Sequence, residues 1–360
     1  MNKKNYHSNL ILSKLWERVE NEKSDSELSY FNSLMYLGEV VSKYTCLFML
    51  SGLNESQKNY KYNQLYKLVR ANGIGDWSTS LEELLTGPSS QELRIDYGSY
   101  HKELAEKTSK NQWQNQAVTN LLECIKITGN EVQVRANKLQ FKIWFNNFSF
   151  LRNKTRGHGA ITIQDAKNIN KFLAPSLKLI CENFSPFHLQ WAYLSQNLSG
   201  KYKVLDISNN TDNFAYLKSS LGTKSSFETG IYVYITEPIK IDLIFTDEDL
   251  SEFFFPNGSF KRNSFELLSY STGSKTIESG EKYLTPPGQL PHSETKGQED
   301  LNVIGNCFTN IPEHSSFYIN RPKLESSLKD ILINERHPIV TLIGRGGTGK
   351  TTLALKSLHD

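Results

Sequence analysis

A short basic stretch near the middle of the chain combines residue types that can act on a phosphate ester. Between Phe150 and Gly159 the sequence reads FLRNKTRGHG, which brings together Arg152, Asn153 and His158. A histidine titrates near neutral pH and can take or give a proton, while a guanidinium group can bind two phosphate oxygens at once. Asn153 would orient either group by hydrogen bonding. The stretch is therefore the first candidate for a catalytic site.

The surroundings of this stretch support two interpretations. Eight Lys or Arg residues lie between positions 131 and 171, against only Glu131 and Asp165, and such a potential attracts a polyanion. Arg156 would then contact a phosphate backbone, or it only keeps the surface soluble. Alternatively, basic residues at a helix C-terminus complement the helix dipole, and the stretch is a solvated helix end with His158 before a capping Gly.

Two further features bear on this choice. Glu39 follows Gly38 in a long apolar segment and is either an inward carboxylate that orients a catalytic Arg or His, or a partly exposed residue. A second Arg and His at similar spacing are Arg94 and His101, separated by IDYGSY, which we predict to be non-helical; no Asn adjoins this arginine. We therefore take Arg94 and His101 as an unrelated pair.

A second group of candidate residues forms a phosphate loop close to residue 360. The segment VTLIGRGGTGKTTLA contains the pattern G-x-x-x-x-G-K-[ST] after an apolar run and before a potential helix. Glycines let backbone N–H groups curl around a phosphate, Lys350 adds a positive charge for the β and γ oxygens, and Thr351 would hold Mg²⁺. The predicted nucleotide-binding residues of the loop are Gly344, Gly346, Gly347, Thr348, Gly349, Lys350, Thr351 and Thr352.

Helices must position the first site, because apolar residues recur at helical spacing over much of residues 8–184. Thr162 and Asp165 mark the start of the last helix, and Asn130 is a possible cap. Arg152 would lie in the last turn of the fifth helix. The predicted helices cover 27–52, 55–72, 79–86, 111–127, 131–153 and 163–183.

The residue pattern changes after Pro186, where short runs of β-branched and aromatic residues alternate with turn residues. Strands are predicted over 203–207, 230–235, 239–245 and 265–270, and a Ser-, Gly- and Pro-rich linker follows. A helix over 324–334 and a strand over 339–343 precede the phosphate loop. The fold class is multidomain: an N-terminal all-α helical bundle (1–184), a small β-rich middle domain (185–271), a linker (272–312) and the start of an α/β P-loop NTPase domain (313–360).

Composition restricts the class of protein only broadly. Of 360 residues 22% are charged, and the net charge of +3 does not by itself predict nucleic-acid binding. A run of 18 apolar residues is absent, and the N-terminus lacks the apolar core of a signal peptide, so we expect a cytoplasmic protein without membrane insertion. Reduced, buried thiols are expected of the four widely spaced cysteines, Cys46, Cys124, Cys181 and Cys307.

The phosphate loop and its flanks resemble the first motif of STAND-type NTPases, the NB-ARC and related signalling ATPases. In that family the loop typically reads G-x-G-G-x-G-K-T-T-L-A, and a hydrophobic-Gly-Arg-Glu segment precedes it. Here FYINRPKLE stands upstream, with Asn320 where Gly is usual and Pro322 where Glu is usual, so only Arg321 is carried over as a nucleotide-binding residue. The resemblance covers about residues 313–360 and implies the N-terminal part of a domain that binds ATP or ADP with Mg²⁺.

The stretch from Arg152 to His158 resembles the R-[polar]-x(4–6)-H motif of HEPN ribonucleases, which are helical bundles that bear the motif at the end of a long helix. The resemblance implies metal-independent RNA cleavage, in which histidine and arginine supply the proton transfer and the cation that the reaction needs. HEPN enzymes usually pair two motifs across a dimer, so a homodimer or larger assembly is also implied.

Together the two resemblances lead us to expect an endoribonuclease effector that a STAND-type nucleotide switch controls, as in prokaryotic antiphage defence. Its catalytic residues would be Arg152, Asn153 and His158, and its partners RNA and ATP or ADP. The alternative is a noncatalytic dimerising or RNA-binding scaffold attached to a regulatory P-loop ATPase. A regulatory ATPase outside defence is a third possibility, because family analogy alone supports the biological role.

Overall fold

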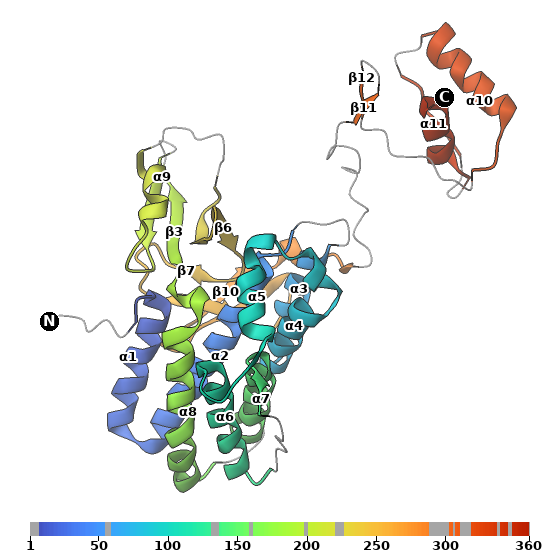
Figure 1. Ribbon diagram of the computed structural model, residues 1–360. Helices are drawn as coiled ribbons and strands as arrows, with labels where there is room; N and C mark the ends of the chain where they lie inside the picture. Colours follow the sequence, from blue (N-terminus) through green and yellow to red (C-terminus); the bar gives the residue numbers. More distant parts are fainter. Residues whose placement is uncertain are drawn as a thin grey trace. The chain divides into compact units, whose positions relative to one another are not determined.

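The computed structural model divides the chain into two compact units, Met1–Gly288 and Gln289–Asp360, which we describe separately (Figure 1). In the first unit it describes residues 7–54, 59–130, 137–157, 161–197, 201–219 and 227–287. In the second it describes residues 302–304, 307–309, 318–336, 339–344 and 348–359.

Helix α2 is the centre of the first unit. It runs from Glu27 to Ser51, and most of its residues from Tyr30 onward are buried because α1, α4 and α8 pack around it. As predicted, Thr162 caps α8 by accepting a hydrogen bond from the backbone N of Asp165. None of the helices in the described ranges combines the length and apolar character needed to cross a bilayer. The other α-helices before the sheets are α1 Leu10–Asp25, α3 Tyr60–Leu68, α4 Ile74–Thr86, α5 Gly98–Ala105, α6 Trp113–Ile127, α7 Lys142–Arg152 and α8 Ile163–Asn183.

Three helices differ from the sequence prediction at their N-terminal ends. The helix expected over 55–72 is α3 and covers only Tyr60–Leu68, because Asn59 before it has a left-handed backbone conformation. The helix expected over 131–153 is α7 and begins only at Lys142, because Leu139–Gln140 forms strand β2, which pairs with β1 (Lys107–Thr108). Residues 131–136 lie outside the described residues. Helix α4 begins five residues before the predicted start at 79, since the Asp76 carboxylate accepts hydrogen bonds from the backbone at its N-terminus.

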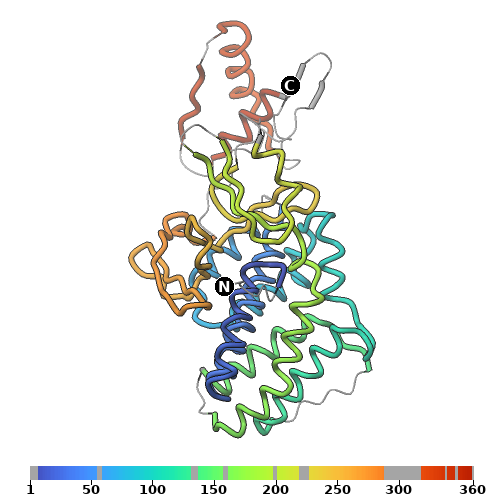
Figure 2. The backbone as a smooth tube through the Cα atoms, turned by 90° about the vertical axis from the view of Figure 1, so that its left-hand side faces the viewer, coloured from blue at the N-terminus to red at the C-terminus, as the bar shows by residue number. Residues whose placement is uncertain are grey.

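Two antiparallel four-stranded sheets follow the helices. The first has the order β4-β3-β5-β6 and the second β10-β9-β8-β7. In Figure 2 the first sheet lies above the helices and the second lies to one side. Their strands are β3 Gln190–Gln196, β4 Tyr202–Asp206, β5 Gly230–Tyr234, β6 Pro238–Ile241, β7 Phe245–Thr246, β8 Phe253–Pro256, β9 Ser264–Ser269 and β10 Lys275–Ser279.

Four of these strands were not predicted as separate strands. The strand predicted over 239–245 ends as β6 at Ile241, and β7 begins only at Phe245 and belongs to the other sheet. Strand β3 pairs on both sides and is mostly buried, so it lacks the alternation that marks a half-exposed strand. Strand β8 lies in the apolar run FFFPNG and is mostly buried. Strand β10 lies within the predicted linker, so the linker prediction is wrong for these residues. β10 is a mostly exposed edge strand that backbone hydrogen bonds hold to β9.

The bundle and the sheets share one hydrophobic core. The main buried cluster includes Phe48 and Trp144 from the helices together with Trp191, Phe255 and Tyr270 from the β-rich part. The boundary predicted at residue 184 thus marks a change of secondary structure, since α8 ends at Asn183, and packing continues across it. The second sheet also contacts α2 directly, because Lys43 of α2 donates a hydrogen bond to the carbonyl oxygen of Pro256 in β8.

The second unit contains two helices and a hairpin in its described parts. Helix α10 covers Pro322–Lys329 and continues as a π-helical turn, Asp330–Asn334, close to the predicted 324–334. The strand predicted over 339–343 is not formed: Ile339 and Ile343 are 84% and 93% exposed. A strand needs a partner, and the described strands of this unit, β11 (Asn302–Ile304) and β12 (Cys307–Thr309), pair with each other. The α/β layout of a P-loop domain remains a prediction.

The buried state predicted for the cysteines is confirmed for three of the four. Cys46, Cys124 and Cys181 are buried and form no disulfide. Burial raises the pKa of each thiol, that of Cys181 to about 12. These thiols therefore act as small apolar side chains of the core.

Candidate functional site

Helix α7 positions the first candidate site by packing tightly on α2. Phe148 lies against Gly38, where an added Cβ would come within 2.3 Å of the phenyl ring, so glycine permits this close approach. Trp144 stacks on Phe148 with ring centroids 4.9 Å apart and nearly parallel planes. The apolar face of α7 is thereby fixed, and its last residue, Arg152, is brought next to Glu39 of α2.

The chain continues from α7 into a single π-helical turn, Asn153–Gly157. The buried Thr155 hydroxyl donates to the Leu151 carbonyl oxygen at 2.8 Å and so ties the turn to the helix. Arg152 is half-buried, and Asn153 is exposed beside it, with its Oδ1 3.5 Å from Arg152 Nη1. His158 lies outside the described residues, so its place in the site stays a prediction.

Glu39 is an inward carboxylate, one of the two alternatives that the sequence left open. Its side chain is only 6% exposed. Arg152 Nε donates to its Oε1 at 3.1 Å, and Arg156 Nη1 lies 3.7 Å from the same oxygen. Nε carries this contact, and Nη1 of Arg152 lies on the side of Asn153. Of the two alternatives for Glu39, the structure has the inward carboxylate, and the partly exposed one is wrong.

The other oxygen of Glu39 contacts the β-rich part. Tyr270, which follows β9, donates its hydroxyl hydrogen to Glu39 Oε2 at 3.0 Å. Buried Lys43 donates to the Tyr270 hydroxyl at 2.7 Å and to the Pro256 carbonyl oxygen at 2.6 Å. Burial lowers the pKa of Lys43 to about 8, with Glu39 opposing the shift, and burial raises the pKa of Tyr270 well above its ordinary value. Tyr270 is therefore a neutral donor to Glu39.

Two further cations complete the site around the ring of Tyr36. The guanidinium carbons of Arg156 and Arg18 lie 3.9 and 4.8 Å from the ring centroid. Arg18 also donates to the Tyr270 carbonyl oxygen at 2.7 Å. We name the whole set the Glu39 cluster; it consists of Arg18, Tyr36, Glu39, Lys43, Arg152, Arg156 and Tyr270.

The Glu39 cluster contains four cationic side chains and a single carboxylate. Each guanidinium has five N–H donors, and the contacts of Arg18 and Arg156 among the described residues use few of them. Such a partly buried excess of positive charge attracts an anion, and a phosphate fits the fork of an arginine. Sequence reasoning missed Arg18, Tyr36, Lys43 and Tyr270. Only Lys43 had a local signal, because it lies one helical turn after Glu39 in an apolar helix.

The pair Arg94 and His101 has a different environment. Arg94 forms ion pairs with Asp96 at 3.0 Å and with Glu237 at 2.7 Å. His101 Nε2 lies 2.8 Å from the Leu85 carbonyl oxygen. The prediction that their spacer is non-helical is wrong, since Ile95–Tyr97 is a 3₁₀-helix and α5 follows directly. A hydrogen bond from Tyr97 N to the Arg94 carbonyl oxygen closes the 3₁₀ turn. Two carboxylates nevertheless neutralise Arg94, which makes it a structural residue.

The phosphate loop of the second unit is described in part. Gly344 and Thr348 to Thr352 are described, whereas Gly346 and Gly347 lie outside the described residues. Lys350 Nζ donates to the Gly344 carbonyl oxygen at 2.9 Å, which joins the two ends of the loop. Gly349 has a φ of +78°, a left-handed conformation that favours glycine, and α11 (Lys350–His359) begins directly after it.

Arg321 contacts the same loop from a distant position in the sequence. Its Nη1 donates to the Thr348 carbonyl oxygen at 2.9 Å, and its Nη2 lies near Gly349. The backbone N of Arg321 donates to the Glu325 carboxylate, which fixes the start of α10. The loop, the helix N-terminus behind it and a neighbouring arginine form a surface that suits a phosphate group. These residues fit a nucleotide, and Thr351 is exposed at the start of α11.

Comparisons of the chain with protein-family models, with curated proteins and with solved structures found no match. The two candidate sites therefore rest on their own geometry and on the residues that compose them.

Proposed function

We propose that the chain is a metal-independent endoribonuclease effector controlled by a STAND-type nucleotide switch. The observation that carries the proposal is the contact between Arg152 and buried Glu39 inside a cluster with excess positive charge. In the sequence this fixed guanidinium precedes Asn153 and His158, the other residues of the HEPN-like motif. A phosphodiester is the polyanion that such a site would bind.

The chemistry follows from the residue types. In the proposed reaction the 2′-oxygen of a ribose attacks the adjacent phosphorus, the bond to the 5′-oxygen breaks, and the 2′-hydroxyl proton passes to His158. An acid protonates the leaving 5′-oxygen, and the second motif of a homodimer is a source for it. Arg152 stabilises the negative charge that develops on the phosphate oxygens, while Asn153 orients the histidine or the phosphate.

The Glu39 cluster supports this role of Arg152 through preorganisation. Glu39 accepts a hydrogen bond from Nε of Arg152, and Tyr270 donates one to Glu39. The guanidinium is therefore already ordered and loses less conformational entropy when a phosphate binds. Arg18 and Arg156 add positive potential around the same position. We therefore assign Glu39 and Tyr270 as positioning residues, and Arg18 and Arg156 as contacts to neighbouring phosphates of the RNA.

The second unit would supply control by binding ATP or ADP with Mg²⁺. Gly344, Gly346, Gly347, Thr348 and Gly349 would surround the phosphates, Lys350 and Arg321 would bind their oxygens, and Thr351 and Thr352 would lie at the start of α11. The metal ion, held in part by Thr351, would neutralise phosphate charge when bound. A role in antiphage defence, as in related effectors, rests on the family analogy.

A noncatalytic dimerising or RNA-binding scaffold is the second candidate. One observation favours it: Arg152 Nε is already paired with a buried carboxylate, as in a structural ion pair. In that case the cation excess would bind RNA without cleaving it.

The test compares the two Arg and His pairs within the full chain. Purified protein is incubated with total RNA in EDTA, beside Arg152→Ala and His158→Ala, with Arg94→Ala and His101→Ala as matched controls. We expect cleavage by the unmodified protein and by both controls, and none by the first two variants. If the unmodified protein is folded and the RNA stays intact, the endoribonuclease proposal is wrong and the noncatalytic scaffold is the remaining candidate. Equal loss in all four variants would point to unfolding, which circular dichroism checks.

A further inference from the structure

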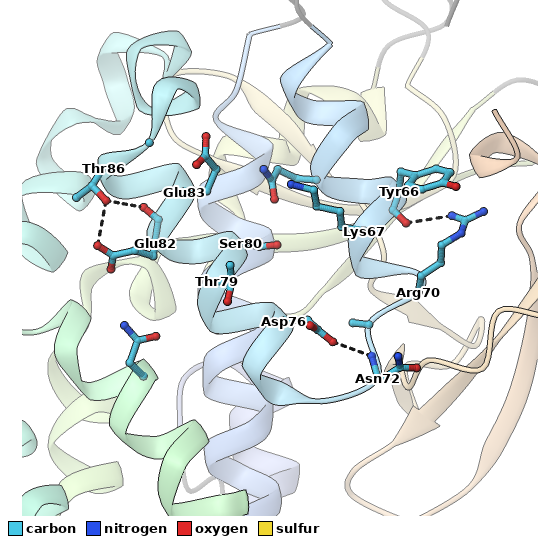
Figure 3. Close-up of a pocket in the computed structure, with 14 residues that line it drawn as sticks. Tyr66, Lys67, Arg70, Asn72, Asp76, Thr79, Ser80, Glu82, Glu83 and Thr86 are labelled. Atoms are coloured by element: carbon cyan, nitrogen blue, oxygen red, sulfur yellow. Dashed lines mark hydrogen bonds between the residues drawn. The ribbon is translucent and has the colours of Figure 1, made fainter. Parts of the chain in front are cut away.

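A hollow between α3 and α4 shares no residue with the Glu39 cluster (Figure 3). Its volume is about 670 Å³, which lies within the range of small-molecule pockets. Helix α3 and the turn after it form one wall, α4 and its C-terminal cap form the other, and α7 contributes Asn146. We name it the α3–α4 groove.

Gln64 of α3 lines the groove and has a buried hydrogen-bond acceptor without a partner among the described residues. Its side chain lines the groove and is 3% exposed, yet its Oε1 has no hydrogen-bond partner in the described part of the chain. Buried polar atoms of native proteins are nearly always hydrogen-bonded, because an unpaired one has lost its water without compensation. A single water needs only about 30 Å³, so the groove has room for a much larger donor.

Three carboxylates line the opposite wall: Asp76, Glu82 and Glu83 of α4. Each uses one oxygen for contacts inside the protein, and among the donors are Asn72 N at 2.8 Å, Lys142 Nζ at 2.7 Å and Ser89 N at 3.4 Å. Their second oxygens take part in no hydrogen bond between described residues. This wall therefore offers acceptors for a cationic nitrogen with several N–H groups.

Of the two cationic side chains on the α3 wall, Arg70 and Lys67, only Lys67 extends toward the α4 wall. Arg70 turns away from α4, and its guanidinium stacks on Tyr66 and Phe260 and donates to the Tyr283 carbonyl oxygen (Figure 3). Lys67 extends into the space between the helices instead, and within the described chain it forms no ion pair. Opposite charges thus face one groove without meeting across it.

We propose that the α3–α4 groove binds a small zwitterion. Its cationic nitrogen lies at the free oxygens of the α4 wall and at Gln64 Oε1, and its carboxylate or phosphate lies at Lys67. A zwitterion of this polarity satisfies both walls and the buried amide together, whereas a simple anion would face three carboxylates and a simple cation would leave Lys67 without a counter-charge. Groups held in place before binding lose little entropy when the ligand arrives.

The first arm of the test varies the probe. Isothermal titration calorimetry of the full chain uses L-arginine, agmatine, which lacks the carboxylate, and L-citrulline, which has a neutral urea in place of the guanidinium. We expect millimolar or tighter binding of L-arginine and at least about tenfold weaker binding of the other two. L-lysine and phosphoethanolamine extend the panel to a shorter cation and to a phosphate. No binding by L-arginine, L-lysine or phosphoethanolamine would overturn the proposal, and so would agmatine binding as tightly as L-arginine.

The second arm varies the protein, with Lys110→Met as an exposed lysine control outside the groove. Lys67→Met should remove the preference for L-arginine over agmatine, and Glu83→Gln should reduce the preference over L-citrulline. Gln64→Leu should weaken L-arginine binding by about tenfold while the melting temperature stays the same or rises, because the leucine has no unmet acceptor. Unchanged affinity in all three folded variants would show that the zwitterion binds elsewhere and would refute the assignment.

Discussion

Arg152 and Arg94 each precede a histidine at a similar spacing, but their environments differ in charge balance. Arg94 meets two carboxylates, Asp96 and Glu237, which complete its ion pairing. Arg152 shares the single carboxylate of Glu39 with Arg156, and further cations lie close by. The spacing of an arginine and a histidine therefore does not distinguish the two environments; the charges that tertiary contacts bring together do.

The largest expected difference concerns activity. Arg152→Lys keeps a positive charge but loses the planar fork and the contact from Nε to Glu39. We expect RNA cleavage to fall by about 10²-fold or more, the scale for loss of a charge-stabilising donor. Arg94→Lys should leave the rate within about twofold, since ordinary surface changes perturb little. Initial rates on a fluorescent RNA measure both, and equal losses would contradict the comparison.

The next difference concerns the two acidic partners. Glu39→Gln removes the only carboxylate of a buried cluster and leaves several cations unpaired. We expect the free energy of unfolding to fall by about 3 kcal/mol, the cost of breaking a buried ion pair. Asp96→Asn acts on a more exposed pair and should cost about 1 kcal/mol or less.

Urea denaturation followed by tryptophan fluorescence provides both values for this pair of variants. A larger loss for Asp96→Asn than for Glu39→Gln would show that the Arg94 pair, not the Glu39 cluster, stabilises the fold.

Glu39 and Asp96 each also accept a hydrogen bond from a hydroxyl group, so removing that hydroxyl is a smaller substitution that can be made at both sites. Tyr270→Phe removes the donor to Glu39 and an acceptor of Lys43, and should cost about 2 kcal/mol because a buried charged group loses a hydrogen bond. It should also slow RNA cleavage. Thr236→Val removes the exposed donor to Asp96 and should cost well under 1 kcal/mol. Unfolding and cleavage assays on both variants decide whether Tyr270 positions Glu39.

The last expected effect is a pH dependence carried by Lys43. Its pKa of about 8 in the folded chain lies below its unfolded value near 10.4, so between these values the unfolded chain binds more protons. Stability from this group therefore rises with pH above about 8, by at most about 1.4 kcal/mol per pH unit. Glu39 and Arg152 are the charged groups that act on it.

The measurement is the difference in unfolding free energy between the unmodified chain and Lys43→Met from pH 7.5 to about 9.5, below the titration of tyrosines. The difference cancels contributions from the buried cysteines, whose raised pKa values act in the opposite direction. A difference that does not change with pH would mean that Lys43 stays charged throughout.

Regular elements were predictable where one face of the element is buried. Helices α2, α6 and α8 follow the predicted ranges within two residues because their apolar residues recur at helical spacing. Strand β3 is buried on both sides and β10 is exposed, so neither shows an alternating pattern. The strand predicted over 339–343 has the right composition but no partner strand in the described part of its unit.

The site was predictable only in part. Arg152 and Asn153 stood out by type and spacing, and an inward Glu39 was one of two alternatives. Tyr270 and Arg18 carry no local signal, because their contacts join residues more than two hundred positions apart. The groove beside Gln64 was likewise not foreseen, since an unmet amide appears only when α3 and α4 are placed together.

The amino-acid sequence by itself determined the helical and β-rich regions, the basic stretch that ends α7 and the glycine pattern of the phosphate loop, because these depend on neighbours in the chain. Tertiary structure decided which arginine keeps an excess of positive charge. Packing of α7 against Gly38 brought Arg152 to Glu39, and the second sheet brought Tyr270 to the same carboxylate, whereas Asp96 and Glu237 reached Arg94. Charges act through distance in space and through burial, and sequence spacing specifies neither of them.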